Sequence, residues 1–191
     1  MNEFGKVTMN LIAASLEKAA ATGINKQVII GNWDDIDRNE SIIENGVLVS
    51  LDLKPGKKAY KFESIEKSTT GEAILAKGTY FDNYDHAVTI RAFSKKQEVK
   101  NFVNSLKSAR VFVIVENKEI GPDGEVKYEL YGWDNGIKLA ELPYTTDFAD
   151  GVVYSMKLAS DENAKEGQLP LSVYAETLTD TENMIAGLVA E

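Results

Sequence analysis

Short segments in which every second residue is apolar follow one another along most of this sequence. The clearest are residues 47–53, 87–93 and 152–158, and turn sequences occur at 54–57, 121–124 and 134–136. A repeat of two residues is that of a β-strand with one buried face. About nine or ten such strands, at spacings of about 10 to 15 residues, predict a β-sandwich or an incomplete barrel.

Three other segments place their apolar residues at helical spacing. The clearest is 95–108, which begins in a capping box (94–97) and carries one stripe formed by Val99, Phe102, Val103 and Leu106. Residues 8–22 predict a second short helix, and residues 179–191 a third, behind a capping box at 179–182. The sequence therefore predicts an α+β fold, mostly β, with a flanking helix and short terminal helices.

The turns indicate which strands are neighbours. Residues 47–53 and 60–65 lie on either side of Pro55-Gly56 and predict a hairpin, and 111–115 and 126–131 predict another. Residues 26–31 suit a strand, whereas 33–46 are polar and irregular. We therefore expect three parts: an N-terminal helix with an irregular arm (1–46), a β-rich core domain (47–178) and a C-terminal helix (179–191).

Few residues could carry out catalysis. The chain has no cysteine and one histidine, His86, which we place at an exposed strand end without the companions that a zinc site or a general base needs. No phosphate-binding glycine loop and no nucleophile elbow is present. We expect no enzyme activity, no cofactor, and no catalytic, cofactor-binding or metal-binding residue.

One acidic segment has part of a calcium-binding pattern. Asp35, Asp37 and Asn39 repeat the first ligand spacing of an EF-hand loop, but Glu40 and Gly46 stand where the glycine and the bidentate glutamate are required. The pattern favours an acidic surface loop. Whether a ligand or cation binds loop 34–40 is left open by the sequence.

The charge disfavours nucleic acid as a partner. Thirty acidic and 21 basic residues give a net charge of −9, which repels DNA and RNA at long range. The nearest basic run, formed by Lys54, Lys57, Lys58 and Lys61, is typical of a solvated hairpin end. No run of about 18 apolar residues is present, so we expect no membrane contact and synthesis in the cytoplasm.

The second half of the chain resembles a family of phage proteins. Residues 109–174 contain VFVIVENK, a GPDG turn, KYELYGWDNGIKLAEL, DGVVYSMKLAS and LPLSVY, a succession similar to tail-tube and tail-terminator proteins of phages that infect gut anaerobes. The resemblance implies subunits whose strands join neighbouring copies into a ring or tube. It also implies that the protein is made in the host cytoplasm and becomes part of the virion.

We therefore expect a structural assembly protein of a phage-like virion, in a tail tube, a connector ring or a capsid-associated position. Its partners would be copies of itself in a ring or tube and other virion subunits. The interface candidates are apolar residues of the two terminal helices: Leu11, Ile12, Leu16, Ile185, Leu188 and Val189.

Two alternatives stay open. A ligand- or carbohydrate-binding β-sandwich would use Trp33, Tyr131 and Trp133 as a platform, because flat rings stack on sugars and bases. An enzyme would use scattered carboxylates, although no pair among the 30 acidic residues is singled out.

Overall fold

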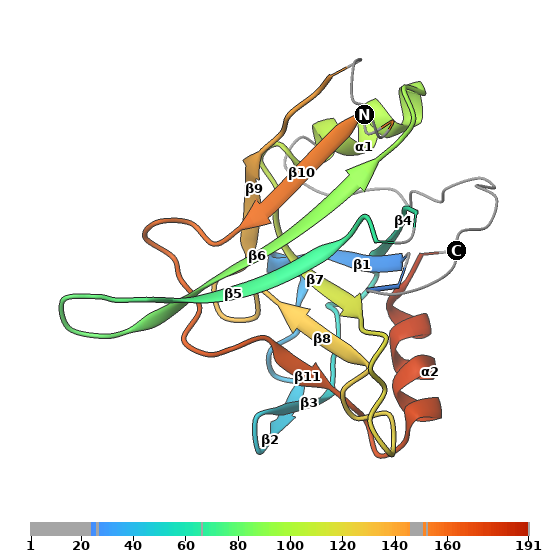
Figure 1. Ribbon diagram of the computed structural model, residues 1–191. Helices are drawn as coiled ribbons and strands as arrows, with labels where there is room; N and C mark the ends of the chain where they lie inside the picture. Colours follow the sequence, from blue (N-terminus) through green and yellow to red (C-terminus); the bar gives the residue numbers. More distant parts are fainter. Residues whose placement is uncertain (1–23, 26, 66, 146–150, 152, 191) are drawn as a thin grey trace.

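The computed structural model describes residues 24–190, apart from 26, 66, 146–150 and 152 (Figure 1). Its class is α+β and mostly β, as the sequence predicts. One open sheet contains all the strands, with one helix on each side. The strands are β1 (Gln27–Asn32), β2 (Ile42–Glu44), β3 (Val47–Ser50), β4 (Tyr60–Glu63), β5 (Thr70–Ala76), β6 (Asn83–Ala92), β7 (Arg110–Glu116), β8 (Tyr128–Tyr131), β9 (Ile137–Glu141), β10 (Tyr154–Ala159) and β11 (Leu171–Val173). The helices are α1 (Gln97–Leu106), α2 (Leu178–Leu188) and the short 3-10 helix η1 (Trp33–Asp35).

Strand β7 is the centre of the sheet. One of its edges pairs with β1, and the opposite edge pairs with β8 over Val113–Glu116 and with β9 over Arg110–Val111. The sheet therefore divides beyond β7 into two branches. One runs β9, β10, β6, β5, and the other runs β8, β11, β3, β2. The turn at 132–136 joins β8 to β9 and so marks the point of division.

Both faces of β7 are buried, each in its own apolar core. Val111, Val113 and Val115 face a core that includes α1, whereas Phe112 and Ile114 face a core that includes α2. This two-sided burial explains why the segment VFVIV is apolar throughout instead of alternating. Gly31 of β1 lies opposite Phe112, where a Cβ atom would come within 2.1 Å of the phenyl ring. The glycine makes room for that ring.

Helix α1 confirms the predicted amphipathic stripe. Its four apolar residues are buried, and Phe102 packs against Phe62 of β4 with ring centres 5.3 Å apart. The predicted capping box is not formed, because Lys96 is the N-cap residue and no side chain caps it. Ser94 Oγ instead accepts a hydrogen bond from the Lys96 amide at 3.2 Å.

Helix α2 confirms the predicted C-terminal helix but begins earlier than its expected cap. Thr177, not Thr179, is the N-cap residue, and its hydroxyl accepts a hydrogen bond from the Asp180 amide at 3.1 Å. The same Thr-x-x-acid spacing occurs two residues apart in the sequence, and the structure uses the first occurrence.

Two expectations about the first third of the chain are wrong. Residues 47–53 and 60–65 do not form a hairpin, because β3 pairs with β2 and β11 while β4 pairs with β1. The strand expected at 26–31 is confirmed as β1, but it belongs to the sheet and not to a separate arm, and the region 33–46 is not irregular throughout. Strand β1 lies inside the sheet between β4 and β7, and the unforeseen strand β2 forms a hairpin with β3 through the predicted Asn45-Gly46 turn. The sheet thus begins 20 residues before the boundary expected at residue 47.

Candidate interaction surfaces

The single histidine is buried, which corrects the prediction of an exposed strand end. His86 is 1% exposed, and its ring contacts Tyr131 edge-on with centres 5.5 Å apart. The Gly132 amide donates to Nδ1 at 3.2 Å, and Nε2 lies 2.9 Å from the Gln168 carbonyl, to which it donates. Both ring nitrogens are therefore used in holding β6 to the 132–136 turn and to the 165–168 segment.

Glu166 makes a second buried link at the same place. Its side chain is fully buried, and its carboxylate accepts hydrogen bonds from the amides of Asp134 at 2.6 Å and Asn135 at 3.0 Å. The Asp134 carboxylate in turn accepts from the Gly167 amide at 2.8 Å. Burial raises the pKa of Glu166, and the two amides oppose that shift. These reciprocal bonds fasten the 165–168 segment across the division of the sheet.

A stack of tryptophan and arginine side chains occupies the outer side of the same turn. The guanidinium of Arg110 lies 3.7 Å from the ring centre of Trp33, and that of Arg38 lies 4.0 Å from the ring centre of Trp133. Trp33 Nε1 donates to the Trp133 carbonyl at 2.8 Å. Gly136 has a φ of +72°, and a Cβ atom there would lie 2.9 Å from the Trp33 ring. The stack fixes the loop after β1 to the turn after β8.

The aromatic platform expected for a sugar ligand is not formed. Trp133 and Tyr131 are 8% and 6% exposed, so their faces are covered by the protein itself. Trp33 is half-buried between two arginines. Burial also raises the pKa of Tyr131, with the nearby Glu129 carboxylate adding to the shift.

The acidic loop 34–40 uses its carboxylates locally. Asp35 is buried, accepts a hydrogen bond from the Asn32 side chain at 3.2 Å, and lies 3.6 Å from the Lys57 ammonium. Asp37 accepts from the Asn39 amide at 3.1 Å. Within the described residues, no group of three or more His, Asp or Glu side chains is placed to hold a metal ion.

The predicted interface residues have different outcomes. Leu11, Ile12 and Leu16 lie outside the described residues. Ile185 and Leu188 are 6% and 7% exposed, because they pack into the second core against the sheet. Val189 is half-buried against the same core. The stripe of α2 is thus covered by this chain's own sheet.

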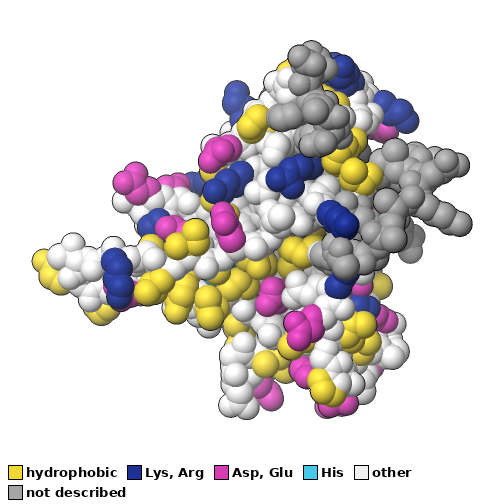
Figure 2. Space-filling model, viewed as in Figure 1, with side chains coloured by type: hydrophobic (Ala, Val, Ile, Leu, Met, Phe, Trp, Pro, Cys, Tyr) yellow, Lys and Arg dark blue, Asp and Glu magenta, His cyan; other side chains and the backbone are white. Residues whose placement is uncertain are grey.

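A projecting hairpin carries apolar surface that the sequence did not single out. Strands β5 and β6 pair over Thr70–Ala76 and Asn83–Thr89, but β10 covers β6 only from Ala87 onward. Beyond β10, Tyr84 of β6 pairs with Glu166 through two backbone hydrogen bonds, and the tip past Tyr84 extends beyond the sheet (Figure 1). It exposes Tyr80 by 88%, Phe81 by 81%, Ile74 by 57% and Leu75 by 47%. Figure 2 shows hydrophobic side chains along this hairpin.

No protein-family model matches this chain, and no curated protein or solved structure is significantly similar to it. Within the described residues, no helix has both the length and the apolar character needed to cross a membrane. The class that the fold defines is a mostly β protein with an open, branched sheet.

The burial of His86 predicts a dependence of stability on pH. Burial lowers the pKa of His86 below 6.5, an effect that the Gln168 carbonyl partly offsets. The unfolded chain then binds a proton that the folded chain does not, so the free energy of unfolding is largest above pH 6.5 and decreases as the pH falls through that value. For one proton the slope has an upper limit of about 1.4 kcal/mol per pH unit.

Urea melts between pH 5.5 and 7.5 measure this slope, and His86→Gln should remove it. The assignment is direct because the chain has one histidine and no cysteine. The pKa of Glu166 is raised, so its contribution to the free energy of unfolding decreases as the pH rises, which is opposite to that of His86. Measuring the slope in a Glu166→Gln background therefore isolates the contribution of the histidine. Equal slopes with and without His86 would contradict the assignment.

Proposed function

We propose that this chain is a structural subunit of a phage-like virion that acts through contacts with copies of itself and with other virion subunits. The tail tube, a connector ring and a capsid-associated position are the places that fit the resemblance of residues 109–174. The protein would be made in the host cytoplasm and incorporated into the particle. It would need no cofactor and carry out no reaction.

The projecting β5–β6 hairpin is the observation that carries this proposal. β5 is the last strand of its branch, so its outer edge faces away from the sheet. Exposed sheet edges with apolar side chains pair readily with other chains, and natural proteins usually shield them. A partner that covers the hairpin supplies both the missing strand neighbour and the missing apolar contact.

An exposed ion pair and a backbone hydrogen bond close the hairpin's tip. The Lys77 ammonium lies 2.6 Å from the Asp82 carboxylate, and the Gly78 amide donates to the other Asp82 oxygen at 3.4 Å. Tyr80 and Phe81 lie between these residues and point outward. A tip closed in this way loses less conformational entropy on binding, which favours its use as an anchor.

Replacing the two tip aromatics by serine should abolish assembly without unfolding the protein. Burial of each ring in an interface contributes about 1.5 to 3 kcal/mol, so Tyr80→Ser/Phe81→Ser should weaken association at least about 100-fold. Light scattering and electron microscopy would show rings or filaments for the original chain and monomers for the variant. The melting temperature should not change, because both side chains are exposed.

The matched control keeps the tip apolar. Tyr80→Leu/Phe81→Leu should still assemble, since the contact is apolar rather than specific to aromatic rings. An original chain that stays strictly monomeric at high concentration and joins no particle in a complementation assay would overturn the proposal. Neighbouring genes for capsid, portal or tail-measure proteins would support it independently.

A further inference from the structure

Charge is unevenly distributed over the molecule. Residues 95–110 contain five basic residues and one acidic residue, Glu98, which leaves 16 basic and 29 acidic residues elsewhere. Arg110 is held by Trp33 and Asp34. The other four, Lys95, Lys96, Lys100 and Lys107, are exposed on α1 and beside its two ends. We refer to these four lysines as the basic end.

The acidic counterpart is formed by two segments that contact each other. It comprises the loop between β7 and β8 and the start of α2, with Glu119, Asp123, Glu125, Glu176, Asp180 and Glu182. The Tyr174 hydroxyl donates to the Asp123 carbonyl at 3.1 Å, which joins the two segments. We refer to these six residues as the acidic end.

The basic residues within the acidic end do not reduce its exposed charge much. The Lys127 side chain is only 14% exposed and lies 2.6 Å from Glu182 and 3.3 Å from Glu116. The Lys118 ammonium is buried. What this end presents to solvent is therefore mainly carboxylate.

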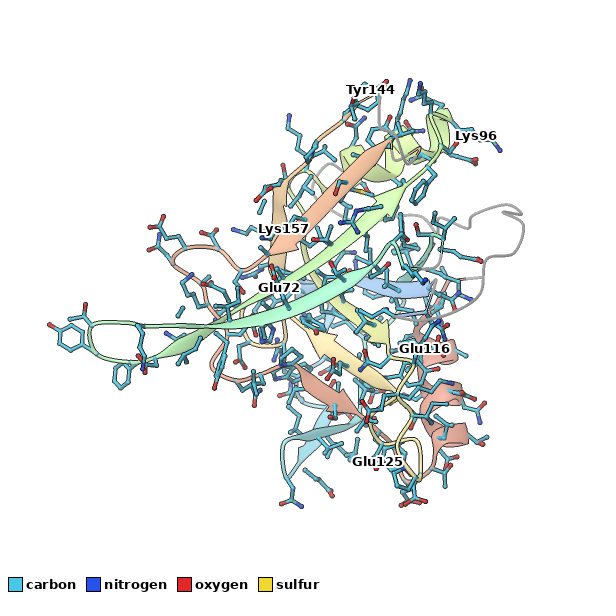
Figure 3. The ribbon with its side chains drawn as sticks, in the orientation of Figure 1. Glu72, Lys96, Glu116, Glu125, Tyr144 and Lys157 are labelled. Carbon is cyan, nitrogen blue, oxygen red and sulfur yellow. The ribbon has the colours of Figure 1, made fainter. Side chains whose placement is uncertain are left out.

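The two ends lie on opposite sides of the molecule. Figure 3 labels Lys96 near α1 at one extreme and Glu125 at the other, with Lys157 and Glu72 between them. Figure 2 shows Lys and Arg side chains around the first end and Asp and Glu side chains gathered at the second. Exposed charges of opposite sign are therefore concentrated at two separate ends of the molecule.

We propose that the acidic end of one copy docks on the basic end of the next, so that copies of this chain stack head to tail. This inference rests on the proposed assembly function and gives it a direction. Equal ends repel and opposite ends attract, so only one relative orientation is favourable. An interface between two different surfaces of the same protein does not close on itself as a two-fold dimer does. It generates a ring when the rotation between copies closes and an extended stack when it does not, and the opposite positions of the two ends favour a stack.

A second copy fits these observations better than nucleic acid does. DNA would meet four lysines at one end and a net charge of −9 on the chain as a whole. A second copy instead offers the basic end a carboxylate surface and places the rest of its own negative charge farther away. The complementary partner is thus already encoded in the same chain.

Charge reversal tests the docking. Lys95→Glu/Lys100→Glu and Glu119→Lys/Glu176→Lys change exposed residues whose side chains make no ion pair in the part of the chain that the structure describes. Each double variant should associate at least about tenfold more weakly at about 0.1 M salt, and salt near 1 M should weaken the original chain similarly. Sedimentation and electron microscopy measure the stack length.

Two further samples make the test specific. A mixture of the two double variants should form pairs, because the unchanged acidic end of one variant can dock on the unchanged basic end of the other. The quadruple variant keeps the net charge of the original chain and should still not stack, which separates the charge of the two ends from the net charge. Lys138→Glu/Lys157→Glu, a reversal on β9 and β10 between the ends, should leave stacking intact.

The outcomes separate this inference from the proposed function. Stacks of unchanged length after both reversals, or no pairs on mixing, would overturn head-to-tail docking, while rings formed through the hairpin would still support assembly. Loss of DNA binding in the lysine variant with unchanged self-association would also overturn it, in favour of a nucleic-acid contact. Loss of all assembly in the serine variant of the hairpin tests the function alone.

Discussion

Replacing Phe102 by alanine should lower the free energy of unfolding by about 3 to 5 kcal/mol. Phe102 is fully buried in the first core, where its ring packs against Phe62 and joins α1 to β4. Truncation removes the apolar contacts of the ring and leaves a cavity that a helix anchored by Val99, Val103 and Leu106 cannot fill. Urea melts followed by circular dichroism measure the loss.

Asn104→Ala is the matched control, because Asn104 lies on the exposed face of the same helix. Its effect should stay within about 0.5 kcal/mol. If Phe102→Ala costs less than about 1 kcal/mol, α1 does not pack on the sheet in the way described here.

Replacing Glu166 by alanine should cost about 2 to 4 kcal/mol, because the half-buried amides of Asp134 and Asn135 would lose their acceptor. The cost is smaller than the sum for two strong bonds, since removal of a buried carboxylate also removes its desolvation penalty. Thermal and urea melts at pH 7 measure the change.

Glu162→Ala is the matched control, because it removes an exposed glutamate from the same segment between β10 and β11. It should leave stability nearly unchanged. Glu166→Gln should fall between the two alanine variants, because the amide oxygen keeps one acceptor. Equal stability of the variants at 166 and 162 would contradict the fastening role of Glu166.

Local patterns predicted much of this fold because they act within a few residues. The stripe of α1, the Asn45-Gly46 turn and the alternating Tyr154, Met156 and Leu158 of β10 are each set by near neighbours. Apolar spacing alone therefore sufficed to place most strands and both described helices.

The errors come from contacts between residues far apart in the chain. Pro55-Gly56 is good turn chemistry, but it does not show that β4 pairs with β1 instead of β3. A charged or polar sequence context likewise made His86 look exposed, although Gly132 and Gln168, which lie 46 and 82 residues away, bury and satisfy its ring. The stack of Trp33 on Arg110 and the hydrogen bonds of Glu166 are also contacts between distant residues, which the sequence pattern does not reveal.

The candidate surface was harder to predict than the fold. Ile74, Leu75, Tyr80 and Phe81 have the composition of a buried strand and its turn, but they lie on an edge strand and at the tip of its hairpin, where they stay exposed. The terminal-helix residues Ile185 and Leu188 show the reverse, since an amphipathic stripe looks the same whether its own sheet or a neighbour covers it. The tertiary arrangement decides which apolar surface stays exposed to solvent.

The position of β7 has a consequence for the order in which the chain can fold. Its edge partners come from residues 28–32 on one side and from 128–131 and 137–138 on the other, so the central strand gains its last neighbours only after most of the polypeptide has been synthesised. The pairing of β1 with β7 joins residues that lie 79 to 87 positions apart, which is slow compared with forming the local β5–β6 hairpin. The hairpin's apolar tip therefore forms before the centre of the sheet is complete.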